Sequence, residues 1–163
     1  MSIVSLVANS LGDPVPNGRA ADIVRGVQRM LDELGLASLT EVTLANGRRA
    51  DVMAVSPKGE IAIVEVKSCL QDFRVDRKWP EYAPYCDRFY FAIDCDFPKE
   101  RIPETCGLLV CDGFGGAVVR EAEAALLPGA RRKAVTLSFA RLAAARLMRA
   151  GEWGPAAAEP AID

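Results

Sequence analysis

The stretch RADVMAVSPKGEIAIVEVKS, residues 49–68, limits the possible folds of this chain more than any other part of the sequence. Two β-like runs flank the turn SPKGE, which is the pattern of a β-hairpin. The second run is apolar on both faces until Glu65, and strands of this kind lie in the middle of a sheet. Charged side chains are costly to bury there, so the clustering of Asp51, Glu65 and Lys67 at the ends of the two runs needs a physical reason.

The spacing of apolar residues predicts the elements around this hairpin. Helical spacing runs from Arg19 to Leu34, with Asn17 as the N-cap and Gly35 as the stop. A second helix, with arginines on its outer side, is predicted over Ser138–Ala150 and should end at Gly151. The other predicted elements are strands at 39–45, 48–55, 61–67, 87–94, 107–112 and 116–121, and a helix at 69–78 followed by a short turn.

This order predicts an α/β fold in which helices flank a mixed central sheet. For a chain of 163 residues we expect one domain, and we assign it to residues 17–150. Residues 1–16 are expected to form a lead-in, and residues 151–163 a disordered tail.

The composition excludes several kinds of active site. The chain has no histidine, so Ser-His and Cys-His systems are excluded, and acid–base chemistry is left to carboxylates, lysines, tyrosines or a metal-bound water. The five cysteines, at positions 69, 86, 95, 106 and 111, include no CxxC pair, which argues against a disulfide scaffold or a structural zinc site. We expect them to be small buried hydrophobes in a cytoplasmic protein, with no membrane-spanning run and no signal peptide.

The charge of the chain is unevenly distributed. The formal net charge is −2, but the segment from Arg120 to Arg149 holds seven basic and two acidic residues, a balance of +5 that leaves −7 for the remainder. A basic flank on an acidic body is typical of a nucleic-acid-binding face, and it is also typical of a solvated helix surface.

Asp51, Glu65 and Lys67 form the candidate site. Side chains alternate along a strand, so Glu65 and Lys67 share one face, and the hairpin register places Asp51 close to Glu65. Two carboxylates repel one another unless a positive charge lies between them, and Mg²⁺, which prefers oxygen ligands, would meet that need. The alternative is a cross-strand salt bridge on an exposed sheet face, with Lys67 and Arg49 as the cations.

These residues resemble the D…(D/E)xK motif of the PD-(D/E)xK nuclease superfamily, through Asp51 and the tripeptide Glu65-Val66-Lys67. The longer run from EVTLANGRRADV to DRFYFAID resembles the MmcB-like DNA repair proteins, a branch of that superfamily, over about residues 20 to 120. The proline of the superfamily motif is Ala50 here, a departure that is common among its members.

The resemblance implies a restriction-endonuclease-like αβββαβ core and a role for each motif residue. Asp51 and Glu65 become Mg²⁺ ligands, for which Mn²⁺ can substitute, and Lys67 becomes the catalytic lysine. The Val66 carbonyl and Glu41 are further ligand candidates. Lys78 and Tyr82 resemble a Q-x-x-x-Y element that would contact the substrate, although a buried Tyr82 and a solvated Lys78 are equally compatible with the sequence.

From the sequence we therefore expect an Mg²⁺-dependent endonuclease that acts on DNA in damage repair, with DNA and other DNA repair proteins as partners. One alternative is a DNA-binding or protein-binding module that retains the fold without turnover. Another is an enzyme acting on a small phosphorylated molecule, which lacks support because the chain contains no GxxxxGK[ST] loop.

Overall fold

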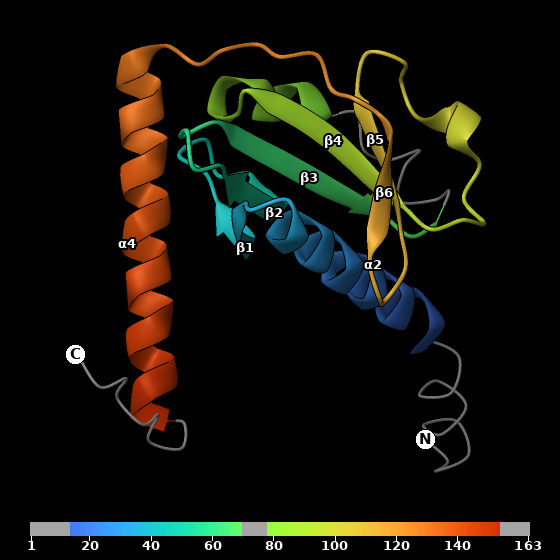
Figure 1. Cartoon of the computed structure of the whole chain (residues 1–163), viewed down its shortest axis with the longest axis horizontal. Helices are drawn as coiled ribbons and strands as arrows, with labels where there is room; N and C mark the ends of the chain where they lie inside the picture. The colour runs from blue at the N-terminus through green and yellow to red at the C-terminus, as the bar shows by residue number, and fades with distance from the viewer. Residues whose placement is uncertain (1–13, 70–77, 154–163) are drawn as a thin grey trace, which may run out of the picture.

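One mixed sheet of six strands, in the order β1-β2-β3-β4-β5-β6, forms the centre of the protein (Figure 1). The computed structural model describes residues 14–69 and 78–153. Residues 1–13 of the predicted lead-in, 70–77 of the predicted helix at 69–78 and 154–163 of the predicted tail lie outside these residues. The strands are β1 (Ala37–Thr43), β2 (Arg49–Val55), β3 (Ile61–Lys67), β4 (Arg88–Ile93), β5 (Gly107–Cys111) and β6 (Gly116–Arg120).

The pairing of the strands confirms the predicted mixed α/β fold. β1, β2 and β3 form an antiparallel meander, β3 pairs with β4 and β4 with β5 in parallel, and β6 returns antiparallel to β5. The predicted strands are all present, with ends that differ by one or two residues. β3 lies in the interior of the sheet and is buried along almost its whole length, as its double-sided apolar sequence predicts.

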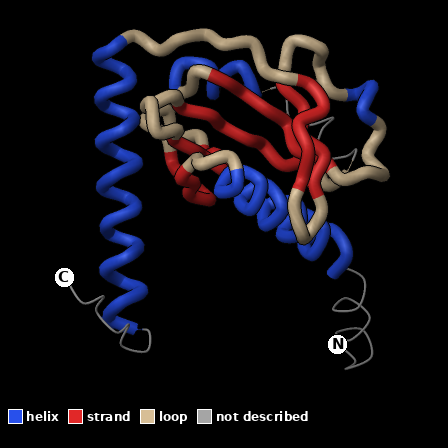
Figure 2. Tube along the Cα trace, in the orientation of Figure 1, coloured by secondary structure: helices blue, strands red, loops and turns tan. Residues whose placement is uncertain are grey.

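Each face of the sheet has its own apolar cluster. Helix α2 (Pro14–Glu33) covers one face, where Ile23 and Val27 pack against Val52 and Val64. The other face is covered by η1 (Trp79–Tyr85), a 3₁₀-helix, and by part of α4 (Gly129–Trp153), and its cluster includes Met53. Figure 2 shows α2 and η1 on opposite sides of the strands.

The start of α2 differs from the prediction, and its end agrees with it. The helix begins at Pro14 and not near Arg19, because proline is tolerated in the first turn, where its missing N–H has no partner in the helix. Gly35 ends it with φ = 77°, and the Leu36 amide donates to the Leu31 carbonyl at 2.8 Å. This six-to-one hydrogen bond across a left-handed glycine is a Schellman motif.

Helix α4 is longer than predicted at both ends. It begins at Gly129, nine residues before Ser138, and continues through Gly151 to Trp153. A glycine inside an exposed helix costs about 1 kcal/mol relative to alanine and does not by itself end the helix. Figure 1 shows α4 standing beside the sheet and connected to β6 by a long segment that passes above β4 in this view.

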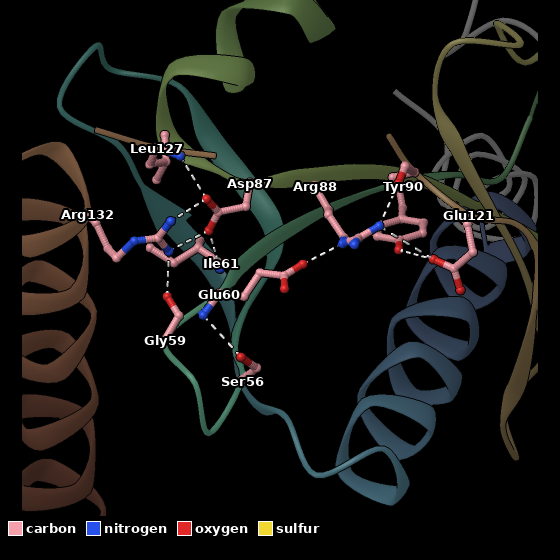
Figure 3. Close-up of polar contacts among 11 residues, drawn as sticks. Ser56, Gly59, Glu60, Ile61, Asp87, Arg88, Tyr90, Glu121, Leu127 and Arg132 are labelled. Atoms are coloured by element: carbon pink, nitrogen blue, oxygen red, sulfur yellow. Dashed lines mark hydrogen bonds and ion pairs between the residues drawn. The ribbon is translucent and has the colours of Figure 1, made fainter. Parts of the chain in front are cut away.

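Asp87 and Arg132 join α4 to the sheet (Figure 3). The Arg132 guanidinium donates to both carboxylate oxygens of Asp87, at 2.6 and 2.7 Å, and also to the Gly59 carbonyl at 2.7 Å. Asp87 accepts two more hydrogen bonds, from the main-chain amides of Ile61 and Leu127, each at 2.8 Å. Asp87 is fully buried, so these bonds compensate for the loss of its hydration.

The basic segment is therefore only partly available to a partner. Arg132 binds Asp87, Arg131 lies over the Tyr85 ring at 5.0 Å, and Arg120 donates to the carbonyls of Cys106 and Pro103. Three other basic side chains of the segment are exposed: Lys133, Arg141 and Arg149.

The cysteines largely follow the prediction. Cys86, Cys106 and Cys111 are buried free thiols, and Cys69 is half-buried, but Cys95 is exposed. Burial raises the pKa of Cys86 and of Cys111 to about 12, so both thiols are unreactive near neutral pH. Within residues 14–69 and 78–153, no helix is long and apolar enough to cross a lipid bilayer.

Candidate active site

The strands β2 and β3 separate at Asp51 and Glu65. Their ladder runs from the Val55–Ile61 pair to the Val52–Val64 pair and stops there. One further step of the same register places Asp51 opposite Glu65, so the hairpin brings these two residues together as its register predicts. In place of a main-chain ladder bond, the Asp51 amide donates to Glu65 Oε1 at 3.1 Å, and the Val66 amide donates to Asp51 Oδ2 at 2.7 Å.

The two carboxylates thus take acceptor positions that main-chain carbonyls occupy in a regular antiparallel pair. Each one accepts a hydrogen bond from the main chain of the opposite strand, which helps to fix both side chains. The geometry is preorganised by the sheet, as the positioning of a binding or catalytic group requires.

Burial makes this a costly place for negative charge. Glu65 is only 5% exposed, and Asp51 is half-buried. Burial raises the pKa of the Asp51 carboxyl above its ordinary value, and the Glu41 charge acts in the same direction. The Val66 amide and the Lys67 ammonium oppose this shift without cancelling it.

Lys67 is the last residue of β3 and is 6% exposed. It shares a face with Glu65 because it lies two residues further along the strand. Its ammonium lowers the pKa of Asp51, so these two charges of the predicted triad act on one another. Because Glu65 and Lys67 are both buried, they do not lie on an exposed sheet face, as the salt-bridge alternative assumed. Ion pairing of Lys67 with the carboxylates stays a prediction.

Glu41 lies at a bend in β1, opposite Asp51. Its φ of 52° is in the left-handed region, which no other non-glycine residue of the described chain adopts. The β1–β2 ladder pairs Thr40 with Val52 and Val42 with Ala50, but it has no pair at the intervening position. The Glu41 carboxylate is half-exposed and forms an ion pair with Arg49 Nε at 2.5 Å.

The predicted role of Glu41 as a third ligand is therefore not reproduced in this arrangement. In the described part of the chain, no three Asp, Glu, Cys or His side chains are close enough together to hold a metal ion. The candidate ligand pair is Asp51 and Glu65, and the role of the Val66 carbonyl stays a prediction.

Arg146 was not predicted to act at the site, yet it holds the bend at Glu41. Its guanidinium reaches from α4 and donates to the carbonyls of Thr40, at 2.6 Å, and Glu41, at 3.0 Å. No local sequence pattern reveals this contact, because the partners are separated by more than 100 residues.

The sequence predicts that Lys78 and Tyr82 share one face of an α-helix, but in the structure they do not. Lys78 precedes η1, a 3₁₀-helix with about three residues per turn, so residues four apart do not align. Tyr82 is buried, stacks with Phe89 at 5.7 Å and donates its hydroxyl to the Arg49 carbonyl at 3.2 Å. It supports the start of β2 from within the core, and Lys78 is exposed.

The pair of carboxylates suits a hard divalent cation. Mg²⁺ is usually bound through one or two carboxylates and retains several waters, so a cluster of three acids is not required. The raised pKa of Asp51, caused mainly by burial, also shows that the neighbouring cations do not fully compensate this carboxylate. Asp51 and Glu65 therefore fit Mg²⁺ or Mn²⁺ as oxygen donors.

Comparisons with known proteins identify the family and the fold of the chain. The family model described as "DNA repair protein MmcB-like" matches residues 8–154. The solved structure of the SPO1766 protein of unknown function from Silicibacter pomeroyi is 42% identical and superposes with a TM-score of 0.78, covering 88% of this chain and 97% of that one. Among the curated proteins, none matches this chain.

Proposed function

Because the chain belongs to the MmcB-like family of DNA repair proteins, we propose that it is a metal-dependent endonuclease that hydrolyses DNA phosphodiester bonds during damage repair. The observation that carries the proposal is the arrangement of Asp51, Glu65 and Lys67. Two carboxylates and an ammonium gather where β2 and β3 separate, and the main chain fixes both carboxylates.

In this function Asp51 and Glu65 would hold the cation, with the Val66 carbonyl as a further oxygen ligand. A bound divalent cation supplies Lewis-acid activation of water and offsets charge on the phosphoryl group. Asp51 and Glu65 each keep one oxygen on a main-chain amide, which maintains their orientation before and during binding.

Lys67 would act on the phosphodiester through its charge. Its ammonium would stabilise the negative charge that develops on the phosphate, or orient the attacking water. Because Lys67 is 6% exposed, little solvent screens this interaction. Exposed basic residues of α4, Lys133, Arg141 and Arg149, would add contacts to the DNA backbone, and Lys78 remains a further candidate for substrate contact.

A second candidate function is a binding module for DNA or protein that has the fold but no turnover. It is favoured by Glu41, whose carboxylate pairs with Arg49 and leaves two acids at the site. It is disfavoured by Glu65 and Lys67, since a module without chemistry has no need for a buried carboxylate and a buried ammonium side by side.

A nicking assay on supercoiled plasmid and on branched DNA, with Mg²⁺ or Mn²⁺, distinguishes the two. The wild-type protein should cleave, and Lys67→Ala should reduce the rate by about 10²-fold or more while DNA affinity changes little. Lys58→Ala, which removes an exposed lysine from the β2–β3 turn, serves as the control and should cleave normally. If no substrate is cleaved and Lys67→Ala only lowers the melting temperature, the binding module is the correct function.

A further inference from the structure

Helix α4 has an inner side that packs against the described chain and an outer side that is exposed among the described residues. On the inner side, Val135, Phe139 and Leu142 belong to the apolar cluster beneath the sheet, and Arg146 binds β1. With 3.6 residues per turn, another set of residues lies on the side of the helix opposite to these four. These residues, which we call the outer stripe, are Leu137, Ala140, Ala144, Leu147 and Met148.

The outer stripe is apolar and exposed. Leu137 is 57% exposed, Leu147 76% and Met148 58%, and both alanines are exposed as well. A surface helix normally places its polar residues on the solvent side. Exposed large apolar residues gathered in one place are typical of a surface that binds another macromolecule.

The spacing of the outer stripe is that of a helix-pairing seam. Leu137, Ala140, Ala144 and Leu147 follow one another at intervals of three, four and three residues, the repeat along which two α-helices pack side by side. Small residues in the middle of the seam let the second helix approach closely, and the two leucines fill the ends. From Leu137 to Met148 the stripe spans about 17 Å, or three turns.

The charge around the stripe selects the kind of helix that fits. Exposed Lys133 and Arg141 border it, and the helix has no acidic residue from Gly129 to Gly151. A second copy of α4 would therefore bring basic residues against basic residues along the stripe, because Glu152, near the end of the helix, is its single acidic residue, and this opposes pairing. Duplex DNA would satisfy the arginines but offers no apolar surface to cover the leucines.

We propose that the outer stripe of α4 binds an amphipathic helix of another protein, one that is apolar on one face and carries glutamate or aspartate at the edges of that face. The apolar face covers Leu137, Leu147 and Met148, and the acidic edge pairs with Lys133 and Arg141. This interaction surface shares no residue with the candidate active site, but it includes Lys133 and Arg141, which are also proposed to contact the DNA backbone.

The test uses two designed 21-residue helical peptides and the full-length protein. One peptide has leucine and alanine at the seam positions and glutamate at the flanking positions, and the other has lysine in place of every glutamate. In a fluorescence anisotropy titration, the acidic peptide should bind at least about tenfold more tightly than the basic one. Equal affinity of the two peptides would overturn the proposal.

Variants of the chain locate the binding surface. The double substitution Leu137→Gln and Leu147→Gln should weaken the acidic peptide by at least about tenfold, and so should Arg141→Glu. These side chains are exposed, so the circular dichroism spectrum and melting temperature should stay unchanged. Leu126→Gln removes a leucine that is 75% exposed but lies outside α4, and it should leave peptide binding intact.

Two further measurements separate the other possible occupants of the stripe. Sedimentation velocity of the wild-type chain should show a monomer, and a dimer that the double leucine variant dissociates would assign the stripe to a second copy. DNA affinity should be the same for wild type and the double leucine variant. A loss of DNA binding in that variant would assign the stripe to nucleic acid and overturn the proposal.

Discussion

The main-chain amide of Asp51 donates a hydrogen bond to the carboxylate of Glu65 across the β2–β3 hairpin, at 3.1 Å. The Val66 amide returns one to Asp51 at 2.7 Å. Main-chain amides of the sheet itself therefore help to hold the pair of candidate ligands. The predictions at this site follow from that relationship.

Divalent metal binding should require both members of the pair. Calorimetric titration with Mn²⁺ should show binding by the wild-type protein that Asp51→Asn or Glu65→Gln abolishes, because each removes a carboxylate charge. At a Mn²⁺ concentration of 100 times Kd, wild type should gain about 2.7 kcal/mol in its free energy of unfolding. Asp22→Asn, on an exposed turn of α2, is the control. Undiminished Mn²⁺ binding by both site variants would exclude this pair as the metal site.

Without metal, Asp51 should make the folded state less stable as pH rises. Its folded pKa lies above the ordinary 3.8 because of burial, so its stabilising contribution is complete below that value and is lost as pH rises through the raised pKa. Asp51→Asn should therefore melt at a higher temperature than wild type near pH 8 in EDTA, and the difference should shrink toward pH 4. Thermal melts from pH 4 to pH 8 measure this difference in melting temperature. A difference that stays constant over this range would contradict the prediction.

The Asp87–Arg132 pair should be a main determinant of stability. Asp87→Ala leaves the Arg132 guanidinium and two main-chain amides without their acceptor, so the free energy of unfolding should fall by about 3–5 kcal/mol. The exposed pair of Asp22 and Arg25 is the control. Asp22→Ala should change the free energy of unfolding by less than about 1 kcal/mol. Urea denaturation measures both, and similar effects of the two variants would refute the assignment.

Acid should weaken the same pair. Burial alone would raise the pKa of Asp87, but the hydrogen bonds from Arg132, Ile61 and Leu127 outweigh it and lower the pKa below its ordinary value. The contribution of a carboxyl with a depressed pKa is present above the unfolded value of about 3.8 and is lost as pH falls through the folded pKa. The stability advantage of wild type over Asp87→Ala should therefore decrease below pH 4.

The sequence predicts the central sheet well because its signals there are local. Alternation and turn residues define β1, β2 and β3 within 31 residues of chain, from Ala37 to Lys67. The same register brings Asp51 and Glu65 together, so the core of the candidate site is predictable as well. The buried position of β3 follows from apolar residues on both of its faces.

Contacts between distant segments account for what the sequence did not predict. Arg132 meets Asp87 across 45 residues, and Arg146 meets Thr40 across 106, so both resemble ordinary surface arginines when the helix is considered alone. The left-handed backbone of Glu41 has no sequence signal, because glycine or asparagine is the usual residue in that conformation. The early start of α4 was missed since its first turns have few apolar residues.

Arg146 should stabilise the bend at Glu41. Arg146→Ala removes two hydrogen bonds to main-chain carbonyls, so the free energy of unfolding should fall by about 1–2 kcal/mol. Amide hydrogen exchange should accelerate over residues 40–42, and Arg146→Lys should restore part of the protection. Arg149→Ala, an exposed change one turn away, should leave exchange at these amides unaltered. Equal exchange in Arg146→Ala and wild type would show that the bend is held by other contacts.

DNA binding should depend on salt through the exposed basic residues of α4. Replacing Arg131, Arg132 and Lys133 together is a poor test, because Arg132 supports the fold through Asp87 and Arg131 lies over Tyr85. The informative variant combines Lys133→Ala, Arg141→Ala and Arg149→Ala, three exposed side chains.

If those three side chains contact phosphates, each releases counterions on binding, and their loss should reduce the slope of log Kobs against log salt by up to about 2.7 on duplex DNA. A control that removes the same charge elsewhere, Lys58→Ala with Lys99→Ala and Arg101→Ala, should keep the wild-type slope. Fluorescence anisotropy at four or more salt concentrations gives both slopes. If the slope falls equally in the two variants, the effect comes from net charge alone. If the slope falls in neither variant, the DNA contacts lie away from α4. A fall confined to the α4 variant would establish that this helix, joined to the sheet through Asp87 and Arg132, extends the DNA-binding surface beyond the candidate active site.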